Sequence, residues 1–242
     1  MKRALVGDIG GTNARFALWE NDRMHSVKVY QTADYTSPEQ AIDAYLSDHG
    51  LARGALGAVC LAVAGPVDGD AFRFTNNHWR LSRQAFCKTL QVDELLLIND
   101  FSAMALGMTR LQPGEFREVC AGQAEALRPA VVIGPGTGLG VGTLLSLGEG
   151  RWMALPGEGG HVDLPVGNAR EAAIRQQIER EIGHVSAETV LSGGGLLRLY
   201  QAICLLDGHR AVLQTPAAIT EAALAGEPLA CSVIEQFCRF LG

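Results

Sequence analysis

The sequence lacks long apolar runs. No stretch of its 242 residues approaches the ~18 consecutive apolar residues that a membrane-spanning helix needs. The first apolar stretch, Ala4-Leu5-Val6, ends at Gly7 and is too short for the hydrophobic region of a secretion signal. With 48% hydrophobic and 19% charged residues, the composition is that of an ordinary globular protein. We therefore expect a cytoplasmic protein that does not bind a membrane.

Paired cysteines and basic clusters are also missing. No Cys-x-x-Cys pair occurs, so neither a zinc site nor a disulfide framework is indicated. The six cysteines lie in apolar contexts and are expected to be reduced core thiols: Cys60, Cys87, Cys120, Cys204, Cys231 and Cys238. Lys and Arg number 20 against 26 Asp and Glu, a net charge of −6 without any basic run. That balance argues against nucleic acid as a partner.

Glycine, by contrast, is abundant, with 29 residues gathered mostly in a few loops. Apolar runs between the loops predict strands over residues 4–6, 14–19, 27–30, 58–64 and 95–98. Ser37-Pro38 and Ser82 are typical helix starts, which predicts helices from residue 38 to about residue 49 and from residue 83 onward; residues 101–108 are also expected to be helical. This order of strands and helices predicts a mixed sheet flanked by helices.

Near Pro113-Gly114 the pattern begins again. Strands are predicted over residues 131–133 and 141–147, followed by helices over residues 170–182, 196–205 and 232–241. In the first of these helices Ile174, Ile178 and Ile182 share one face, which we expect in the core. Both halves thus follow the order strand, glycine loop, strand, helices. We interpret them as two lobes, residues 1–110 and 111–242, around a cleft.

The first glycine loop contains a carboxylate. Residues 7–16 read GDIGGTNARF; successive backbone N–H groups in such a turn bind phosphate oxygens, and Thr12 adds a hydroxyl donor. Asp8 would repel a lone phosphate. It fits a site in which Mg²⁺ lies between the two, because Mg²⁺ is commonly held by one or two carboxylates and substrate phosphates. The alternative is a tight hairpin with an exposed aspartate.

A second glycine loop, GPGTGLGVG, spans Gly134–Gly142. The strand expected after it and the spacing of its glycines exclude a Rossmann fingerprint, and the chain has no Gly-Lys-Ser/Thr for a P-loop. Alone it is equally compatible with a glycine-rich hairpin. Two loops of this kind are better explained by phosphates held between two lobes.

The stretch LLLINDFSAMALG, residues 95–107, places Asn99 and Asp100 directly after a predicted strand and before a predicted helix. A carboxylate at the carboxyl end of a strand opens into the cleft of α/β proteins, where a general base is useful. The alternative is an ordinary helix cap, which the local pattern alone favours.

Three further loops carry polar side chains. LPGEGGHVDLP, residues 155–165, brings together Glu158, His161 and Asp163, a set better suited to sugar hydroxyl groups than to zinc. The alternative is a surface loop with incidental polar residues. HVSAETVLSGGG, residues 184–195, contains Glu188, which is otherwise an ordinary helix-start acid. FTNNHW, residues 74–79, offers amides, a histidine and an aromatic ring, suited either to a sugar or simply to a turn.

Taken in order, these motifs resemble those of the bacterial-type ATP-dependent glucokinases, within the actin- and hexokinase-like (ribonuclease H-like) superfamily. GDIGGTNARF resembles the first phosphate motif, INDF the sugar and base motif, GPGTGLGVG the second phosphate motif, and LPGEGGHVD with HVSAETVLSG the sugar loops. The resemblance runs from about Val6 to the end of the chain. It implies a two-lobed α/β fold with mixed sheets flanked by helices, and phosphoryl transfer from ATP to the 6-hydroxyl of glucose.

The resemblance also implies roles for individual residues. Asp100 is the general base for the 6-hydroxyl, and the other hydroxyl groups are bound by Asn99, Glu158, His161 and Glu188. Asp8 holds Mg²⁺ through water. The phosphates of ATP are bound by the two glycine loops, at Gly7, Asp8, Ile9, Gly10, Gly11 and Thr12, and at Gly136, Thr137 and Gly138. The expected ligands are ATP, Mg²⁺ and glucose, and the family suggests a homodimer.

Members of that family continue beyond the position of Gly242, through strands, helices and a glycine-rich segment that contacts adenosine. The chain is therefore expected to lack part of its larger lobe. Two other functions stay open on this account: a sugar-binding module without catalysis, and a phosphohydrolase of the same fold.

Overall fold

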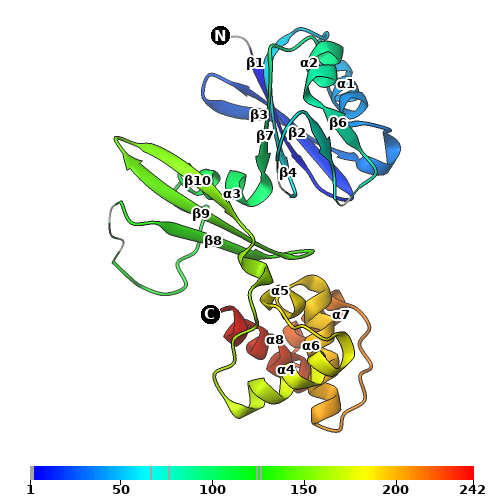
Figure 1. Cartoon of the computed structure of the whole chain (residues 1–242), viewed down its shortest axis with the longest axis vertical. Helices are drawn as coiled ribbons and strands as arrows, with labels where there is room; N and C mark the ends of the chain where they lie inside the picture. The colour runs from blue at the N-terminus through cyan, green and yellow to red at the C-terminus, as the bar shows by residue number, and fades with distance from the viewer. Residues whose placement is uncertain (1–2, 66, 76, 124, 126) are drawn as a thin grey trace. The chain divides into compact units, whose positions relative to one another are not determined.

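The computed structural model describes residues 3–65, 67–75, 77–123, 125 and 127–242. The chain divides into two compact units, Met1–Cys120 and Ala121–Gly242. Each unit has its own sheet (Figure 1). Each also has its own hydrophobic core. The sequence pattern places the division at residues 110 and 111, within the segment that joins the last helix of the first unit to the first strand of the second.

Five strands form the main sheet of the first unit, in the order β3-β2-β1-β4-β7. They are β1 (Arg3–Ile9), β2 (Asn13–Glu20), β3 (Arg23–Gln31), β4 (Leu56–Val63) and β7 (Glu94–Asn99). β1 pairs antiparallel with β2 and parallel with β4, and β4 pairs parallel with β7. The sheet is mixed, as the sequence predicts, and the predicted strands of this unit are confirmed with somewhat different bounds.

Turn and capping residues fix the ends of these elements. Asn21 and Asp22 have positive φ angles of 52° and 60°, the conformation of the tight turn that joins two antiparallel strands. Helix α1 (Pro38–Asp48) begins after Ser37, whose side chain accepts a hydrogen bond from the Gln40 N–H. Helix α2 (Arg83–Leu90) begins in the same way after Ser82, and α3 (Asp100–Met108) follows β7 directly. The three predicted helices of this unit are confirmed.

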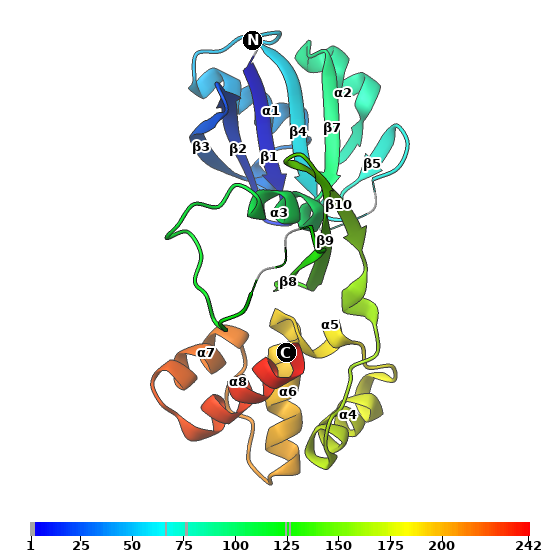
Figure 2. The same ribbon diagram turned by 90° about the vertical axis from the view of Figure 1, so that its left-hand side faces the viewer.

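Helices α1 and α2 pack against the main sheet (Figure 2). Tyr45 of α1 and Phe86 of α2 are fully buried, in one core with Leu5 of β1 and Phe16 of β2. Burying an apolar side chain of this kind contributes about 1.5–3 kcal/mol to the stability of the folded state. This core holds the strands in register, and so fixes the edge of the sheet from which the first glycine loop and Asp100 emerge.

Two short strands, β5 (Ala71–Arg73) and β6 (Arg80–Ser82), pair antiparallel outside the main sheet. The sequence analysis missed both. Each has a single buried apolar residue, Phe72 or Leu81, at its centre. One large apolar residue in three makes no run and no alternation long enough to indicate a strand.

The second unit contains an antiparallel sheet in the order β10-β9-β8. β8 (Ala130–Pro135) and β9 (Leu139–Gly148) are the two strands predicted on either side of the second glycine loop. β10 (Arg151–Gly157), which was not predicted, follows a turn in which Gly148 and Gly150 have φ angles of 78° and 71°. Among the described residues, no strand pairs with the other edge of β8.

This sheet leaves several apolar side chains exposed: Val131, Ile133, Leu147, Met153 and Leu155. Val131 of β8 and Leu155 of β10 lie on either side of Thr143 in the ladder, so both project from the same face. The first sheet has a core on its helical face, whereas this face of the second sheet is open to solvent.

The core of the second unit is helical. It is built from α4 (Ala169–Ile182), α5 (Ala187–Val190), α6 (Gly193–Leu206), α7 (Pro216–Leu224) and α8 (Pro228–Leu241). Helices α4, α6 and α8 match predicted helices, whereas α5 and α7 were not predicted. Ile174 and Ile178 are buried as expected, but the prediction for Ile182 is wrong, because it is 45% exposed. It is the last residue of α4, and the chain turns away at Gly183, whose φ is 80°.

All six cysteines are free. The prediction that they are core thiols is wrong for Cys120, Cys231 and Cys238, which are exposed. Two of these lie on the outer side of α8, where apolar neighbours in sequence do not imply burial. Within the described residues, no single helix is long and apolar enough to cross a membrane; the sharply bent pair α7 and α8 passes that test together, by length and composition alone.

Glu171 links α4 to α8 and should make the second unit sensitive to acid. The Gly167 N–H, 2.6 Å from Glu171 Oε2, holds the pKa of this carboxyl below its ordinary value of 4.5, against the opposing effect of burial. Gln236 of α8 adds a weaker hydrogen bond, at 3.5 Å. Because the folded-state pKa is lowered, the stabilisation is present above the ordinary pKa and is lost as the pH falls through the lowered value.

We expect Glu171→Gln to lower the thermal midpoint by a few degrees at neutral pH, and to have a progressively smaller effect below about pH 4, where the native carboxyl is also being protonated. Thermal unfolding of both proteins across the acid range measures this. Glu179→Gln, on the exposed side of the same helix, is the control. A loss of stability in Glu171→Gln that did not change with pH would contradict the assignment.

Candidate active site

Two of the predicted motifs lie at one edge of the first sheet. The parallel ladder places Ile9 of β1 opposite Val63 of β4, and Val63 opposite Asn99 of β7. The first glycine loop therefore leaves β1 where Asn99 and Asp100 leave β7, two strands away, or about 10 Å across the sheet. Such an edge, where parallel strands end, is the usual ligand-binding edge of α/β proteins.

The turn of the first glycine loop has its carbonyl groups tied to the protein. Thr32 donates its Oγ1 hydrogen to Gly11 O at 2.7 Å and its N–H to Thr12 O at 2.9 Å. Asn77 donates from Nδ2 to Gly10 O at 3.0 Å. Within the described part of the chain, the N–H groups of Gly11 and Thr12 have no hydrogen-bond partner. With the acceptors satisfied and donors left over, the turn fits an anion such as a phosphate.

Three residues assigned to this loop from the sequence, Gly7, Asp8 and Ile9, belong to strand β1. A Cβ atom on Gly7 would lie 2.8 Å from both Leu61 Cδ2 and Phe16 Cδ1. Ile9 is buried in the same core. Packing in the core therefore accounts for the glycine at position 7 and the isoleucine at position 9. The side chain of Asp8 projects from the opposite side of the strand.

Asp8 is paired with a residue that the sequence analysis did not single out. Arg15 Nη1 lies 3.0 Å from Asp8 Oδ2, and the two residues are opposite each other in the β1–β2 ladder. Both side chains are half exposed, and an exposed pair of this kind contributes little to stability. Counting outward from the turn at Gly10–Thr12 would have indicated Arg15 as the cross-strand neighbour of Asp8.

Asn99 and Asp100 begin helix α3. Asn99 Oδ1 accepts the Ser102 N–H at 3.0 Å, so the capping interpretation is confirmed for Asn99. Asp100 Oδ1 accepts the Phe101 N–H at 2.9 Å and a hydrogen from Asn99 Nδ2 at 3.1 Å. Asp100 is half-buried. Its carboxylate is thus held in a fixed orientation at the edge of the sheet where the first glycine loop also lies.

The segment FTNNHW supports the first loop. Besides holding Gly10 O, Asn77 accepts the Trp79 N–H at 2.9 Å. Trp79 is fully buried and donates from Nε1 to Tyr35 O at 2.8 Å. Trp79, which the sequence suggested either for lining a sugar or for a simple turn, is therefore a core residue. Asn76 lies outside the described residues. A small pocket at this edge is lined by Ile9, Gly10, Ala64, Phe74, Thr75 and Asn77.

The second glycine loop repeats the arrangement of the first. Gly136 N–H donates to Gly138 O at 2.7 Å, and Gly136 O accepts the Gly193 N–H, at the start of α6, at 2.8 Å. In the described residues, the N–H groups of Thr137 and Gly138 have no hydrogen-bond partner. The next N–H, that of Leu139, donates to Glu188 Oε2 at 2.8 Å. This turn also presents donors to an anion.

Three of the predicted sugar residues come together in the second unit. His161 Nε2 lies 3.7 Å from Glu158 Oε2, and His161 Nδ1 lies 3.9 Å from Glu188 Oε1. These distances exceed that of a hydrogen bond, so the atoms concerned keep their donor and acceptor capacity for a ligand. All three side chains are at least partly exposed. The set suits a molecule with several hydroxyl groups.

A backbone bridge brings the two sugar loops together. Ala187 N–H donates to Val162 O at 2.8 Å, and Leu164 N–H donates to Val185 O at 3.1 Å. Just outside this bridge, His184 Nε2 lies 2.5 Å from Asp163 Oδ1, a contact that the sequence analysis missed. Among the described residues, no three His, Cys, Asp or Glu side chains are placed to hold a metal ion.

Glycines let the loop of His161 approach strand β9. A Cβ atom on Gly160 would lie 2.3 Å from Leu139 O, and one on Gly159 would lie 3.1 Å from Val141 Cγ2. Neither glycine has a positive φ angle. Close approach, and not backbone conformation, is therefore why these positions carry glycine. The same residue, Leu139, thus touches both the sugar loop and the second glycine loop.

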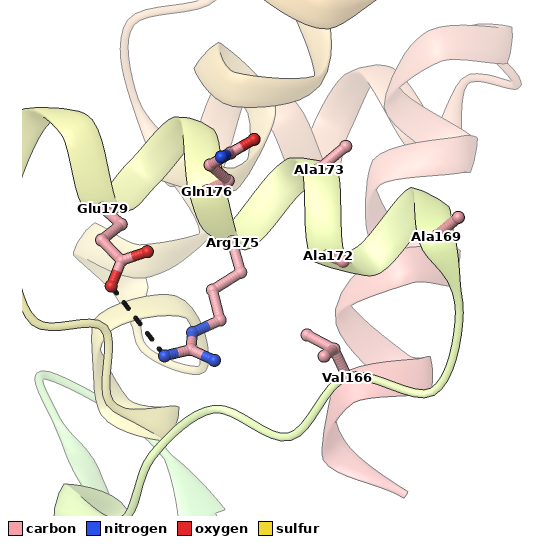
Figure 3. Close-up of a pocket in the computed structure, with 7 residues that line it drawn as sticks. All are labelled: Val166, Ala169, Ala172, Ala173, Arg175, Gln176 and Glu179. Atoms are coloured by element: carbon pink, nitrogen blue, oxygen red, sulfur yellow. Dashed lines mark ion pairs between the residues drawn. The ribbon is translucent and has the colours of Figure 1, made fainter.

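A further pocket in the described structure lies beside α4 and is lined by Val166, Ala169, Ala172, Ala173, Arg175, Gln176 and Glu179 (Figure 3). Arg175 Nη2 and Glu179 Oε1 are 4.0 Å apart at its rim. Its lining shares no residue with the candidate sugar or phosphate groups, so it is separate from the site described above.

Comparison with known proteins assigns the chain to a family. A family model described as Glucokinase matches residues 5–242. The glucokinase of Pseudomonas paraeruginosa is 53% identical over 238 residues, which are 98% of this chain and 70% of that protein. The chain belongs to the glucokinase family.

Solved glucokinase structures share the fold. A glucokinase from an Antarctic psychrotroph has a TM-score of 0.86 at 33% identity, over 100% of this chain and 76% of that one. A ROK family glucokinase from Streptomyces griseus, solved in complex with glucose and AMPPNP, has a TM-score of 0.61 at 21% identity, over 98% of this chain and 76% of that one. The actin- and hexokinase-like α/β fold implied by the sequence motifs is therefore confirmed.

The close approach at Gly160 gives a direct test of the sugar loop. We expect Gly160→Ala to destabilise the chain by about 1–3 kcal/mol, because its methyl group would overlap Leu139 O and push the loop and His161 away from β9. Chemical denaturation measures the loss. Gly194→Ala, where nothing lies within 4 Å of the added atom, is the control and should not destabilise. Equal stability of the two variants would show that the loop does not pack as described.

Proposed function

We propose that this glucokinase-family chain transfers the γ-phosphoryl group of ATP to the 6-hydroxyl of glucose, giving glucose 6-phosphate and ADP. The observation that carries the proposal is the second unit's site, where the hydroxyl-binding set Glu158, His161 and Glu188 adjoins a turn with unbonded N–H groups. Such a site accepts a polyol and a phosphate side by side, as a sugar kinase requires.

ATP and Mg²⁺ fit the two glycine loops. The phosphates would be held by the N–H groups of Gly11 and Thr12 and by those of Thr137 and Gly138, whose neighbouring carbonyl groups are already satisfied. Asp8 would hold Mg²⁺ through water, and its exposed ion pair with Arg15 would break. When bound, the ion would neutralise charge on the transferring group.

Asp100 would act as the general base. It would take the proton from the 6-hydroxyl while that oxygen forms its bond to the γ-phosphorus and the bond from the γ-phosphorus to ADP breaks. The hydrogen bonds from Phe101 and Asn99 hold one carboxylate oxygen of Asp100, which orients the group before reaction. Asn99, Glu158, His161 and Glu188 would bind the remaining hydroxyl groups of glucose.

The comparisons support these ligands. Relatives more than half identical over nearly all of this chain are named glucokinases, and the Streptomyces griseus protein that shares the fold was solved with glucose and AMPPNP. The chemistry of the site agrees, because phosphoryl transfer needs positioning and charge neutralisation more than a covalent intermediate.

Asp100→Asn is the decisive variant. We expect glucose-dependent ADP release to fall by about 10²–10⁴-fold, since the amide does not accept the proton, while the affinity for glucose changes little because the side chain keeps its size. A coupled ADP assay and calorimetric titration with glucose measure the two quantities. Glu94→Gln, at the opposite end of the same strand, is the control and should keep full activity.

The wild-type chain distinguishes the alternatives in the same assay. ADP release that does not depend on sugar would identify a phosphohydrolase. Glucose binding without ADP release would identify a sugar-binding module without catalysis. Full activity in Asp100→Asn would remove Asp100 from the role of base.

A further inference from the structure

We propose that Glu188 is a positioning residue that couples sugar binding to the second glycine loop, so that glucose raises the affinity of the loop for nucleotide phosphates. The inference rests on the proposed function and deepens it. A residue that only contacted sugar would change the affinity for glucose alone. Glu188 is placed to change the affinity for both ligands.

The two oxygens of the Glu188 carboxylate face different partners. Oε2 accepts the Leu139 N–H at 2.8 Å, at the end of the glycine loop. Oε1 points toward His161, 3.9 Å from Nδ1, where it has no hydrogen bond to the ring and can accept one from a sugar hydroxyl. A single carboxylate group therefore connects the candidate sugar-binding residues to the backbone of the second glycine loop.

The same carboxylate explains the glycine at position 138. A Cβ atom there would lie 2.3 Å from Glu188 Oε2 and 3.0 Å from its Cδ. The φ angle of Gly138 is not positive, so the backbone conformation itself does not require glycine. The Glu188 carboxylate occupies the space that a side chain at position 138 would need. It therefore lies directly against Gly138, whose N–H is available to a phosphate.

Glu188 is held by its own helix, and the loop is held on its other side as well. Glu188 lies in the first turn of α5, where the Ser186 and Thr189 side chains form a reciprocal cap. The Gly193 N–H, at the start of the next helix, donates to Gly136 O at 2.8 Å. The loop is thus fixed at Gly136 by α6 and at Leu139 by Glu188, with the unbonded N–H groups of Thr137 and Gly138 between the two anchors.

Sugar binding should strengthen the anchor at Leu139. The Glu188 side chain is 35% exposed, so water can compete with the Leu139 N–H for its carboxylate. A hydroxyl group bound to Oε1 would restrain the carboxylate and keep Oε2 on Leu139. Coupling of this kind is reciprocal, so nucleotide bound to the loop should raise the affinity for glucose by the same factor.

Calorimetry measures the coupling directly. We expect glucose to tighten the binding of AMPPNP with Mg²⁺ to the wild-type chain by at least about 5-fold, in the usual range for linked sites. In Glu188→Ala both affinities should fall and the coupling factor should drop to about 1. His161→Ala is the matched control: it should weaken glucose binding but keep the coupling factor, because the bond between Glu188 and Leu139 remains.

A second pair of variants tests the contact at Gly138. Gly138→Ala should weaken AMPPNP binding by displacing the loop or Glu188. The double variant Gly138→Ala with Glu188→Ala should bind AMPPNP about as tightly as Glu188→Ala alone, because once the carboxylate is gone the added methyl group no longer has anything to displace. Additive losses in the double variant would overturn the proposed contact. Thermal melts of each variant confirm that it is folded before titration.

Hydrogen exchange of the Leu139 amide separates this inference from the proposed function. We expect glucose alone to slow that exchange in the wild-type chain and to leave it unchanged in Glu188→Ala. If the chain binds glucose but not AMPPNP, the proposed function fails, while slower exchange of Leu139 still supports the link. If both ligands bind with a coupling factor of 1, the inference is overturned and the proposed function stands. If neither glucose nor AMPPNP binds, both the proposed function and this inference are overturned.

Discussion

A backbone turn binds an anion only when its N–H groups are unpaired and its carbonyl groups are kept away, and this requirement shapes both units. In the first loop, Thr32 and Asn77 hold the carbonyl oxygens of Gly10, Gly11 and Thr12. In the second, the Gly193 N–H and the loop's own Gly136 N–H do the same. Thr32, Asn77 and Gly193 come from distant parts of the sequence, so each loop depends on the fold of its unit.

The candidate sugar-binding groups depend on the second loop in turn. Glu188 accepts the Leu139 N–H, and Gly160 packs against Leu139 O, so the two sugar loops are built onto the first residue of β9. The backbone bridge between residues 162–164 and 185–187 then sets the distance between His161 and Glu188. If the proposed roles hold, the candidate hydroxyl-binding and phosphate-binding groups of the second unit are all positioned by the start of β9.

Much of the fold follows from local patterns. Strands β1 and β2 follow from apolar runs around a glycine turn, and α1 from a serine cap followed by proline. Helix α7 was missed although Thr215-Pro216 is the same kind of start. Strand β10 was missed because its mostly exposed residues show no clear alternation, and β5 and β6 because each is only three residues long.

The site could be predicted only in part. Motif order and family resemblance indicated which residues to consider, but the pairing of Asp8 with Arg15 follows from strand register, and the bond between Glu188 and Leu139 joins residues 49 positions apart. The burial of Trp79 likewise depends on packing that a six-residue motif does not contain. Contacts of this range are set by tertiary structure, which local spacing does not determine.

The central claim, that two turns with unpaired N–H groups hold the phosphates of ATP, can be tested on the amides themselves. Amide nitrogen–proton NMR spectra of the chain, recorded during titration with AMPPNP and Mg²⁺, report each N–H separately. The account predicts that the largest shifts belong to Gly11, Thr12, Thr137 and Gly138, and that Gly136, whose N–H is already bonded within its loop, moves less. Binding that shifted amides elsewhere and left these four in place would contradict it.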